Sequence, residues 1–488
     1  MIGGTKIRWA YLAAGLYILA NAIAIWQEAY WFAVFPLLAV VIWSVFFRLD
    51  QVLLFIVLCT PISLNLENLE IGGIGFYLPT EPLLFGVLVV FLIKFIRGES
   101  INRKIYTHPI SVLLYVYLAW MGLTTITSEL PIVSIKFMIA KLWFIVPLYF
   151  MMAHIFQDVK NVRRFQLLYI FPLIAVVIYT VARHSGYGFE KDAGHWVMEP
   201  FYKDHTSYGA VLAMYIPVAL GLLIRKKLTP LMRTLIFTAS AILIIGVVLS
   251  FTRAAWVSLL AAAVLMGFMF LRIKLHILLA SVILVGGFVW TMQDDLLIML
   301  EKNTQDSSDN LAEHVESISN VSSDASNLER LNRWYCAFEM FNERPIVGWG
   351  PGTYQFVYAP FQRSTNNTII STNNADGGNA HSEYFGPLSE QGLAGALIML
   401  ALVFAVFRLS FKLFYELKDR EVRILVLTSF LGLVTYFIHG ILNNYLDTDK
   451  ASVPFWGFIA ILVAVDLFHR ETISDPEETA MLTTHESD

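Results

Sequence analysis

Charged residues are scarce in this chain of 488 residues, at 15%, and only two cysteines occur. Soluble domains carry about 25% charged and 45–50% apolar residues, whereas 57% of this sequence is hydrophobic. The scarcity of charge excludes a purely soluble globular protein and a disordered chain. Because Cys59 lies in an apolar run and Cys336 in a polar region, a disulfide framework and a CxxC metal site are excluded as well. The net charge of -4 indicates neither a nucleic-acid binder nor a polybasic membrane-surface protein.

Apolar runs dominate what is there. A membrane-spanning helix needs about 20 mostly apolar residues, and the sequence predicts an all-α polytopic membrane protein with about 12–14 transmembrane helices. The run 51–64 is short and also fits a re-entrant segment. The predicted spans are 9–26, 30–47, 51–64, 79–96, 109–127, 137–155, 164–183, 207–224, 232–250, 254–271, 275–292, 383–407, 424–441 and 452–468.

Lysine and arginine residues set the sidedness. With the N-terminus inside, most of the 34 basic residues fall in short inside segments, as the positive-inside rule requires. The sequence therefore predicts cytoplasmic termini and a bundle of about 11 spans over 1–292. A large outer, periplasmic loop follows over 293–382, then transmembrane helices over 383–468. A disordered cytoplasmic tail is expected over 469–488.

The outer loop contains a predicted amphipathic helix at about 327–343, ended by Pro345. Its apolar residues Leu331, Trp334, Phe338 and Phe341 recur at helical spacing. Arg330 precedes Trp334 by four residues and is expected on this buried face. Arg333 is expected to pair with Glu329 on a more solvated face. An arginine on an apolar face needs an anionic partner, which an internal salt bridge or a bound ligand would supply.

A second arginine, Arg253 in SFTRAAW, lies between two apolar runs on the outer side. Ionisable groups near membrane depth are costly and indicate function, and the start of a helix disfavours a cation. A shared anion such as a phosphate would offset both costs. The alternative is an arginine that extends to the outer interface.

The segment NNADGGNAHSEYFGPLSEQGLAG places a histidine beside the next span. Asn379 is predicted to cap a helix whose first turn holds His381. A helix N-terminus lowers the pKa of a histidine and favours a neutral base at pH 7; the alternative is a structural, capping histidine. The glycine-rich GWGPGTY motif suits a tight turn packed against a sugar or against the protein itself.

His205 in YKDHTSYG is a backup base, with Asp204 as its orienting partner. Trp334, Asn379 and Tyr384 are further supporting residues. The outer loops contain no HExxH, paired CxxC, GxSxG or P-loop pattern, so neither a metal site nor a cofactor is expected.

Taken in order, SFTRAAW, ERLNRW, PIVGWGPGTY and NAHSEYFGPLSEQGLAG resemble segments of the O-antigen ligase and polymerase family of bacterial envelope glycan enzymes. DHTSYGAVLAMYIPVAL and HGILNNYLDTDKASVPFWG also look like family segments. The resemblance implies a GT-C-type membrane glycosyltransferase in the bacterial inner membrane that uses a polyprenyl (undecaprenyl) diphosphate-linked glycan. The predicted span count exceeds the roughly 12 typical of the family.

The resemblance implies that Arg253 and Arg330 bind the donor diphosphate. It implies that His381 is the general base on an acceptor hydroxyl, in metal-independent transfer with inversion. A ligase would transfer to a lipid A-core sugar, whereas a polymerase would join lipid-linked repeat units, and both need the same residues. A transporter or flippase of lipid-linked glycan would instead show related halves and mid-membrane charges, and a nonenzymatic envelope scaffold would not need these residues.

Overall fold

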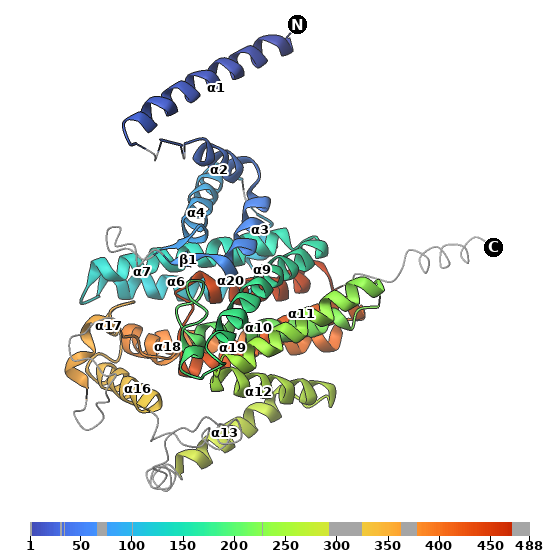
Figure 1. Cartoon of the computed structure of the whole chain (residues 1–488). Coiled ribbons are helices and arrows are strands. Elements are labelled where there is room, and N and C mark those ends of the chain that lie inside the picture. The colour runs from blue at the N-terminus through green and yellow to red at the C-terminus, as the bar shows by residue number, and fades with distance from the viewer. Residues whose placement is uncertain are drawn as a thin grey trace.

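The computed structural model describes residues 2–29, 32–33, 35–65, 76–99, 101–226, 228–291, 325–362 and 378–470. The first part of the predicted outer loop and almost all of the predicted C-terminal tail lie outside these residues. The described part is helical apart from one antiparallel pair of short strands, β1 (Leu64–Asn65) and β2 (Tyr77–Leu78), in which Leu64 faces Leu78. The all-α class is therefore confirmed (Figure 1).

The helices follow the predicted apolar runs closely. They are α1 (Ile2–Trp26), α2 (Phe35–Phe47), α3 (Leu49–Cys59), α4 (Thr80–Ile96), α5 (Arg103–Tyr106), α6 (Pro109–Ile126), α7 (Pro131–Ile145), α8 (Met152–Ile155), α9 (Val159–Ser185), α10 (His205–Leu223), α11 (Pro230–Leu249), α12 (Arg253–Phe270), α13 (Leu275–Thr291), α16 (Ala325–Glu343), α17 (Tyr354–Val357), α18 (Phe385–Glu416), α19 (Arg420–Leu442) and α20 (Asp449–Phe468).

Nine helices of the described part are long and apolar enough to cross a membrane, which makes the chain a multi-pass membrane protein. The predicted runs at 30–47, 51–64, 79–96 and 275–292 instead form helices of 13, 11, 17 and 17 residues. α3 gives way to a short turn that contains Pro61, because proline has no N–H to continue the helical ladder. α7 continues into α8 through a π-helical turn over Val146–Met151 that contains Pro147.

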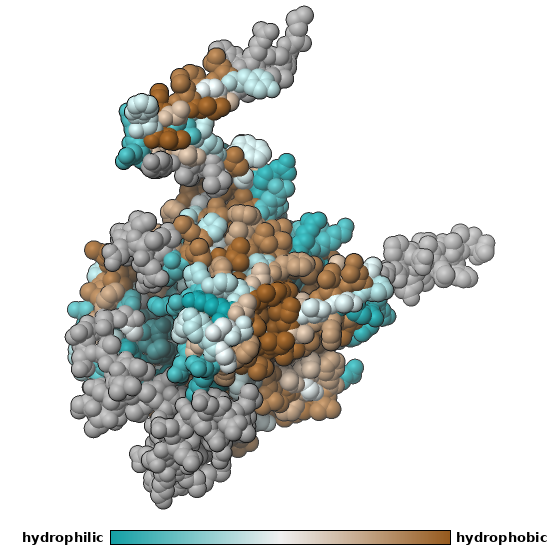
Figure 2. Space-filling view, viewed as in Figure 1, coloured by the Kyte–Doolittle hydropathy of each residue, from teal (hydrophilic) through white to brown (hydrophobic). Residues whose placement is uncertain are grey.

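The centre of the bundle is formed by α19 and α20. In the apolar 18-residue stretch of each helix, 89% and 83% of the residues are buried, respectively. α19 packs against α10, α12, α18 and α20, as expected of a helix that is apolar on all sides. The outer helices expose apolar residues instead, among them Phe237 on α11 and Leu260 on α12, at 64% and 66%. In Figure 2 such residues cover the flank formed by these helices, which is the surface that a bilayer would cover.

A kink in α18 lies where this helix meets the chain that follows α16. Gly392 has φ 68° inside this helix, and a Cβ there would lie 2.2 Å from the carbonyl oxygen of Ile346. The freed N–H of Leu393 donates to the carbonyl of Pro345 at 2.9 Å. Glycine is therefore required where the chain after α16 crosses α18.

The other side of this crossing rests on the turn between α6 and α7. The backbone N–H of Glu129 donates to the carbonyl of Trp349 at 3.0 Å, and the Glu129 carboxylate pairs with Arg344 at 2.7 Å. α16, α17 and the start of α18 consequently lie together at one end of the bundle (Figure 1).

Candidate functional site

The GWGPGTY motif packs against the protein itself, which is one of the two alternatives that its sequence suggests. Gly348 has φ 67°, and a Cβ there would lie 2.3 Å from the backbone carbon of Glu390. The indole Nε1 of Trp349 donates to the carbonyl of Met340 at 2.9 Å. The motif thereby fixes the C-terminal half of α16 onto α18.

The buried face of α16 is not the one that the apolar spacing predicts. Cys336, Ala337 and Met340 are fully buried against Tyr354 and Tyr358. Phe338, expected in the apolar stripe, is 45% exposed. Besides α18, the helix contacts a second neighbour, the chain over 354–361, which includes Tyr354 and Tyr358. The tyrosines of that second neighbour cover the face that helical periodicity alone assigns to solvent.

Arg333 is therefore buried, and its expected place on a solvated face is wrong. Its pairing with Glu329 is correct: Nε lies 2.7 Å from the Glu329 carboxylate, and both side chains are about 5% exposed. The guanidinium stacks on the Tyr358 ring at 4.0 Å. A Cβ on Gly378 would lie 1.9 Å from its Nη1, so the segment before His381 passes directly over this arginine.

His381 precedes α18 by four residues instead of lying in its first turn, which corrects the expected position. It has φ 48°, a left-handed conformation that is uncommon for a non-glycine residue. Its N–H donates to Oδ1 of Asn379 at 3.0 Å, so Asn379 stabilises the turn and not the helix. The side chain of Ser382 accepts from the N–H groups of Tyr384 and Phe385, at 3.2 and 3.4 Å.

Burial and charge hold His381 neutral. Burial, together with the neighbouring Arg330 and Arg333, lowers the pKa of His381 to about 4, because each of them disfavours the imidazolium. The predicted direction is correct, but its cause is burial and two arginines. A neutral imidazole at pH 7 can accept a proton from a substrate.

Arg330 and Arg253 both interact electrostatically with His205, and Arg330 also interacts with His381. Nε of Arg330 donates to the carbonyl of Leu442 at the end of α19, at 3.2 Å. Arg253 is the first residue of α12, and the preceding Thr252 donates to the carbonyl of His205 at 2.8 Å. These contacts gather Arg253, Arg330, His205 and His381 from four different segments into what we call the arginine–histidine cluster.

Asp204 lies beside the cluster as the N-cap of α10. Its Oδ1 accepts from the backbone N–H of Ser207 at 2.7 Å and from the hydroxyl of Thr206 at 2.6 Å. It also attracts His205 electrostatically, and the His205 ring stacks on His195 with centroids 4.3 Å apart. The carboxylate therefore orients the start of the helix that carries the backup histidine.

The remaining supporting residues, Trp334 and Tyr384, donate side-chain hydrogen bonds to backbone carbonyls. Trp334 donates from its indole Nε1 to the carbonyl of His381 at 3.4 Å, and its ring packs against Phe385. The Tyr384 hydroxyl donates to the carbonyl of Phe437 in α19, at 2.9 Å. Both position the segment that carries His381.

Sequence reasoning missed three neighbours of the cluster. His195 stacks on His205, while His439 and Tyr445 interact electrostatically with Arg330. The segment HGILNNYLDTDK, which contains His439 and Tyr445, resembles the family, but no spacing marks either residue. Only the packing of α19 beside α10 brings them to the site.

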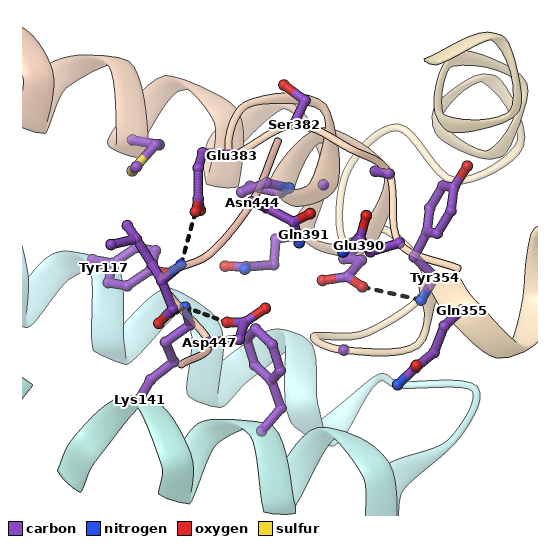
Figure 3. Close-up of a pocket in the computed structure, with 18 of the residues that line it drawn as sticks. Tyr117, Lys141, Tyr354, Gln355, Ser382, Glu383, Glu390, Gln391, Asn444 and Asp447 are labelled. Carbon is purple, nitrogen blue, oxygen red and sulfur yellow. Dashed lines mark hydrogen bonds and ion pairs between the residues drawn. The ribbon is translucent and has the colours of Figure 1, made fainter. Parts of the chain in front are cut away.

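A cavity of about 310 Å³ lies beside His381, and sequence reasoning predicted only Asn379 among its lining residues. Lys141 pairs in it with Asp447 at 2.6 Å. Most of its surface is apolar, but polar and charged side chains from separate segments turn toward it, as Figure 3 shows. We call it the polar cavity; its lining includes Tyr117, Lys141, Tyr354, Gln355, Asn379, Ser382, Glu383, Glu390, Gln391, Asn444, Asp447 and Trp456.

In the described part of the chain, His, Cys, Asp and Glu side chains form no group of three or more suited to hold a metal ion. The cations of the site are arginines, which can bind phosphate groups through paired N–H donors.

A sequence model of the O-antigen ligase family matches residues 238–400. This part of the chain is an O-antigen ligase domain. The O-antigen ligase domain contains Arg253, Arg330 and His381, whereas His205 and Asp204 precede it. The family implies a glycosyltransferase-type ligase activity with a lipid-linked glycan donor and a glycan or lipid acceptor. No curated protein matches the chain.

Proposed function

We propose that the chain transfers a glycan from a polyprenyl (undecaprenyl) diphosphate to an acceptor hydroxyl, with a lipid A-core sugar as the acceptor. The reaction takes place on the periplasmic face of the bacterial inner membrane, is independent of metal and inverts the anomeric centre. The observation that carries the proposal is the placement of the two arginines next to the two histidines. Arg253 follows Thr252, which donates to the carbonyl of His205 at 2.8 Å, and Arg330 lies one turn before Trp334, which donates to the carbonyl of His381 at 3.4 Å.

The arginines suit the leaving group. As the bond between the anomeric carbon and the diphosphate oxygen breaks, negative charge develops on the diphosphate. Guanidinium groups held in a partly buried site stabilise that charge without reorganisation. Nε of Arg330 donates to the carbonyl of Leu442, which positions this guanidinium before substrate arrives, and Arg253 begins α12.

His381 suits the nucleophile. An alcohol is a weak nucleophile and needs a base; in the proposed step His381 accepts the hydroxyl proton while the oxygen bonds to the anomeric carbon. The diphosphate leaves with the electron pair of the broken bond. Attack opposite the leaving group inverts that carbon.

The periplasmic assignment rests on charge. Basic residues concentrate in the segments that alternate to the inside, and α16 with the start of α18 lies on the opposite side of this alternation. The same alternation puts both termini in the cytoplasm and residues 293–382 in the periplasm.

The test is reconstitution of the purified full chain in lipid nanodiscs with a defined polyprenyl-diphosphate glycan. One reaction receives lipid A-core and the other a second lipid-linked repeat unit. Transfer to lipid A-core supports the ligase, and transfer only to the repeat unit identifies a polymerase. Transfer to neither, in protein that binds donor, contradicts the proposal.

His381→Ala in the same assay should abolish transfer and leave donor binding largely intact, because a base contributes about 10²–10⁴-fold only when the proton moves. His154→Ala, in α8 at the other end of the bundle, is the matched control and should retain full rate. If His205→Ala is inactive while His381→Ala turns over, the base is His205.

A further inference from the structure

The polar cavity contains buried polar atoms whose hydrogen-bonding capacity the described part of the chain leaves unused. Oε1 of Gln391 and Nε1 of Trp456 have no hydrogen-bond partner there, and these side chains are 1% and 3% exposed. Oδ1 of Asn444 is also buried without a hydrogen-bond partner in this part of the chain. A buried polar atom without a partner costs free energy, so three such atoms around one cavity indicate a ligand that supplies the missing partners.

The lining offers both kinds of hydrogen-bonding group. The Trp456 indole and the Lys141 ammonium are donors, while the amide oxygens of Gln391 and Asn444 are acceptors. Glu390 accepts from the backbone N–H of Tyr354 at 3.0 Å and retains further acceptor capacity. Sugar hydroxyls donate and accept together, so this mixture fits a hydroxyl-rich ring.

The charges of the lining do not favour the diphosphate in this cavity. Lys141 already pairs with Asp447 at 2.6 Å, and neither arginine of the arginine–histidine cluster lines the cavity. An anionic ligand would have to compete with Asp447 for Lys141, whereas a neutral sugar needs no cation.

The position of the cavity connects it to the proposed reaction. Asn379, Ala380, Ser382 and Glu383, which flank His381 on both sides, form one of its walls. The other walls come from α6, α7, α18, α20 and the chain over 352–355 and 444–447, as the side chains labelled in Figure 3 illustrate, whereas Arg253 and His205 begin α12 and α10. His381 itself is not a lining residue, so a ring in the cavity would lie next to the segment that carries the base, away from the helix starts that are proposed to hold the diphosphate.

We propose that the polar cavity is a sugar-binding subsite, and that it holds the acceptor sugar whose hydroxyl His381 deprotonates. The role in transfer rests on the proposed function, because inversion requires the nucleophile to attack opposite the diphosphate. The donor's own sugar has the same chemistry, and the two sources are separated by experiment.

The test compares Gln391→Met with Gln166→Met in the reconstituted full chain. Methionine keeps the volume and removes the amide. Gln166 is the matched control because it is fully buried and its Oε1 also lacks a partner in the described residues, but it lies on α9 away from the cavity. Asn444→Leu is a second variant of the cavity.

Gln391→Met and Asn444→Leu should each raise the KM of the acceptor about fivefold to tenfold, as expected for one lost hydrogen bond, with kcat and the donor KM close to wild type. A rise in the donor KM alone assigns the subsite to the donor sugar. Unchanged KM values in both variants, or the same change in Gln166→Met, overturn the proposal.

Saturation-transfer NMR with methyl glucoside, methyl N-acetylglucosaminide and methyl rhamnoside separates this proposal from the proposed function. Signal transfer to any of these glycosides in wild type and Gln166→Met, lost in Gln391→Met, supports the subsite even if the wild type transfers no glycan. If no saturation transfer to any of the three glycosides is seen and the KM values are unchanged, the proposed sugar-binding subsite is contradicted.

Discussion

The indole Nε1 of Trp334 donates a hydrogen bond to the backbone carbonyl of His381, with the two atoms 3.4 Å apart. This contact joins α16 to the segment before α18, and it places Arg330, one turn earlier on the same helix, beside the proposed base. The positions of Arg330 and His381 therefore depend on each other through this contact.

Trp334→Phe should lower the transfer rate several-fold with little effect on the donor KM. Phenylalanine keeps the contact with Phe385 but loses a hydrogen bond worth about 0.5–1.5 kcal/mol. Steady-state kinetics of the reconstituted protein measure it. Trp43→Phe on α2, where the side chain is 54% exposed, is the matched control. Equal rates in both variants would show that this contact does not position His381.

The pH profile should be level at neutral pH and fall only in acid. The pKa of His381 is lowered to about 4 by burial and by two arginines, so the imidazole stays unprotonated well below neutral. Arg330→Gln removes one positive charge, which raises this pKa and should move the acid limb of the residual kcat/KM toward neutral. A limb that is unmoved or shifted to lower pH contradicts the role of His381. Samples returned to pH 7 control for unfolding.

Substitutions of Arg330 and Arg333 should affect different properties of the protein, donor binding and stability respectively. Arg330→Lys keeps the charge but loses the bidentate fork, so donor binding should weaken while the melting temperature stays at its wild-type value. Arg333→Met leaves Glu329 buried without its cation and should destabilise the protein by about 3–5 kcal/mol. Thermal unfolding and donor binding measure both variants. Loss of stability in Arg330→Lys with normal donor binding would exchange the two roles.

Transfer should survive an excess of chelator, because in the proposed mechanism Arg253 and Arg330 supply the positive charge that a metal ion would otherwise bring to the diphosphate. The measurement is the rate of the purified enzyme before and after EDTA treatment. A loss that magnesium or manganese restores would contradict metal-independent transfer.

Labelling at Ile346 can show on which side of the membrane the chain after α16 lies, because this residue is 72% exposed. Ile346→Cys should react with a membrane-impermeant maleimide in cells whose outer membrane is permeabilised, and Lys418→Cys, between α18 and α19, should react only after lysis. The native Cys59 and Cys336 are buried and give a low background. The reverse pattern would invert the predicted topology.

The sequence by itself determined the membrane class, the helix α16 and the family segments that contain Arg253, Arg330 and His381. These depend on local quantities: the length of an apolar run and the order of short motifs. The same local rules placed Arg333 on a more solvated face of the helix, because helical periodicity records one apolar stripe and carries no information about a second neighbouring segment.

Only the tertiary structure decided what surrounds the site. It buried Arg333 under Tyr358, placed His381 in a left-handed turn before α18, and assembled the polar cavity from side chains as far apart in sequence as Tyr117 and Trp456. Such neighbours depend on how α6, α7, α18 and α20 pack. That packing is set by the fit of many side chains at once, and no spacing along the chain encodes it.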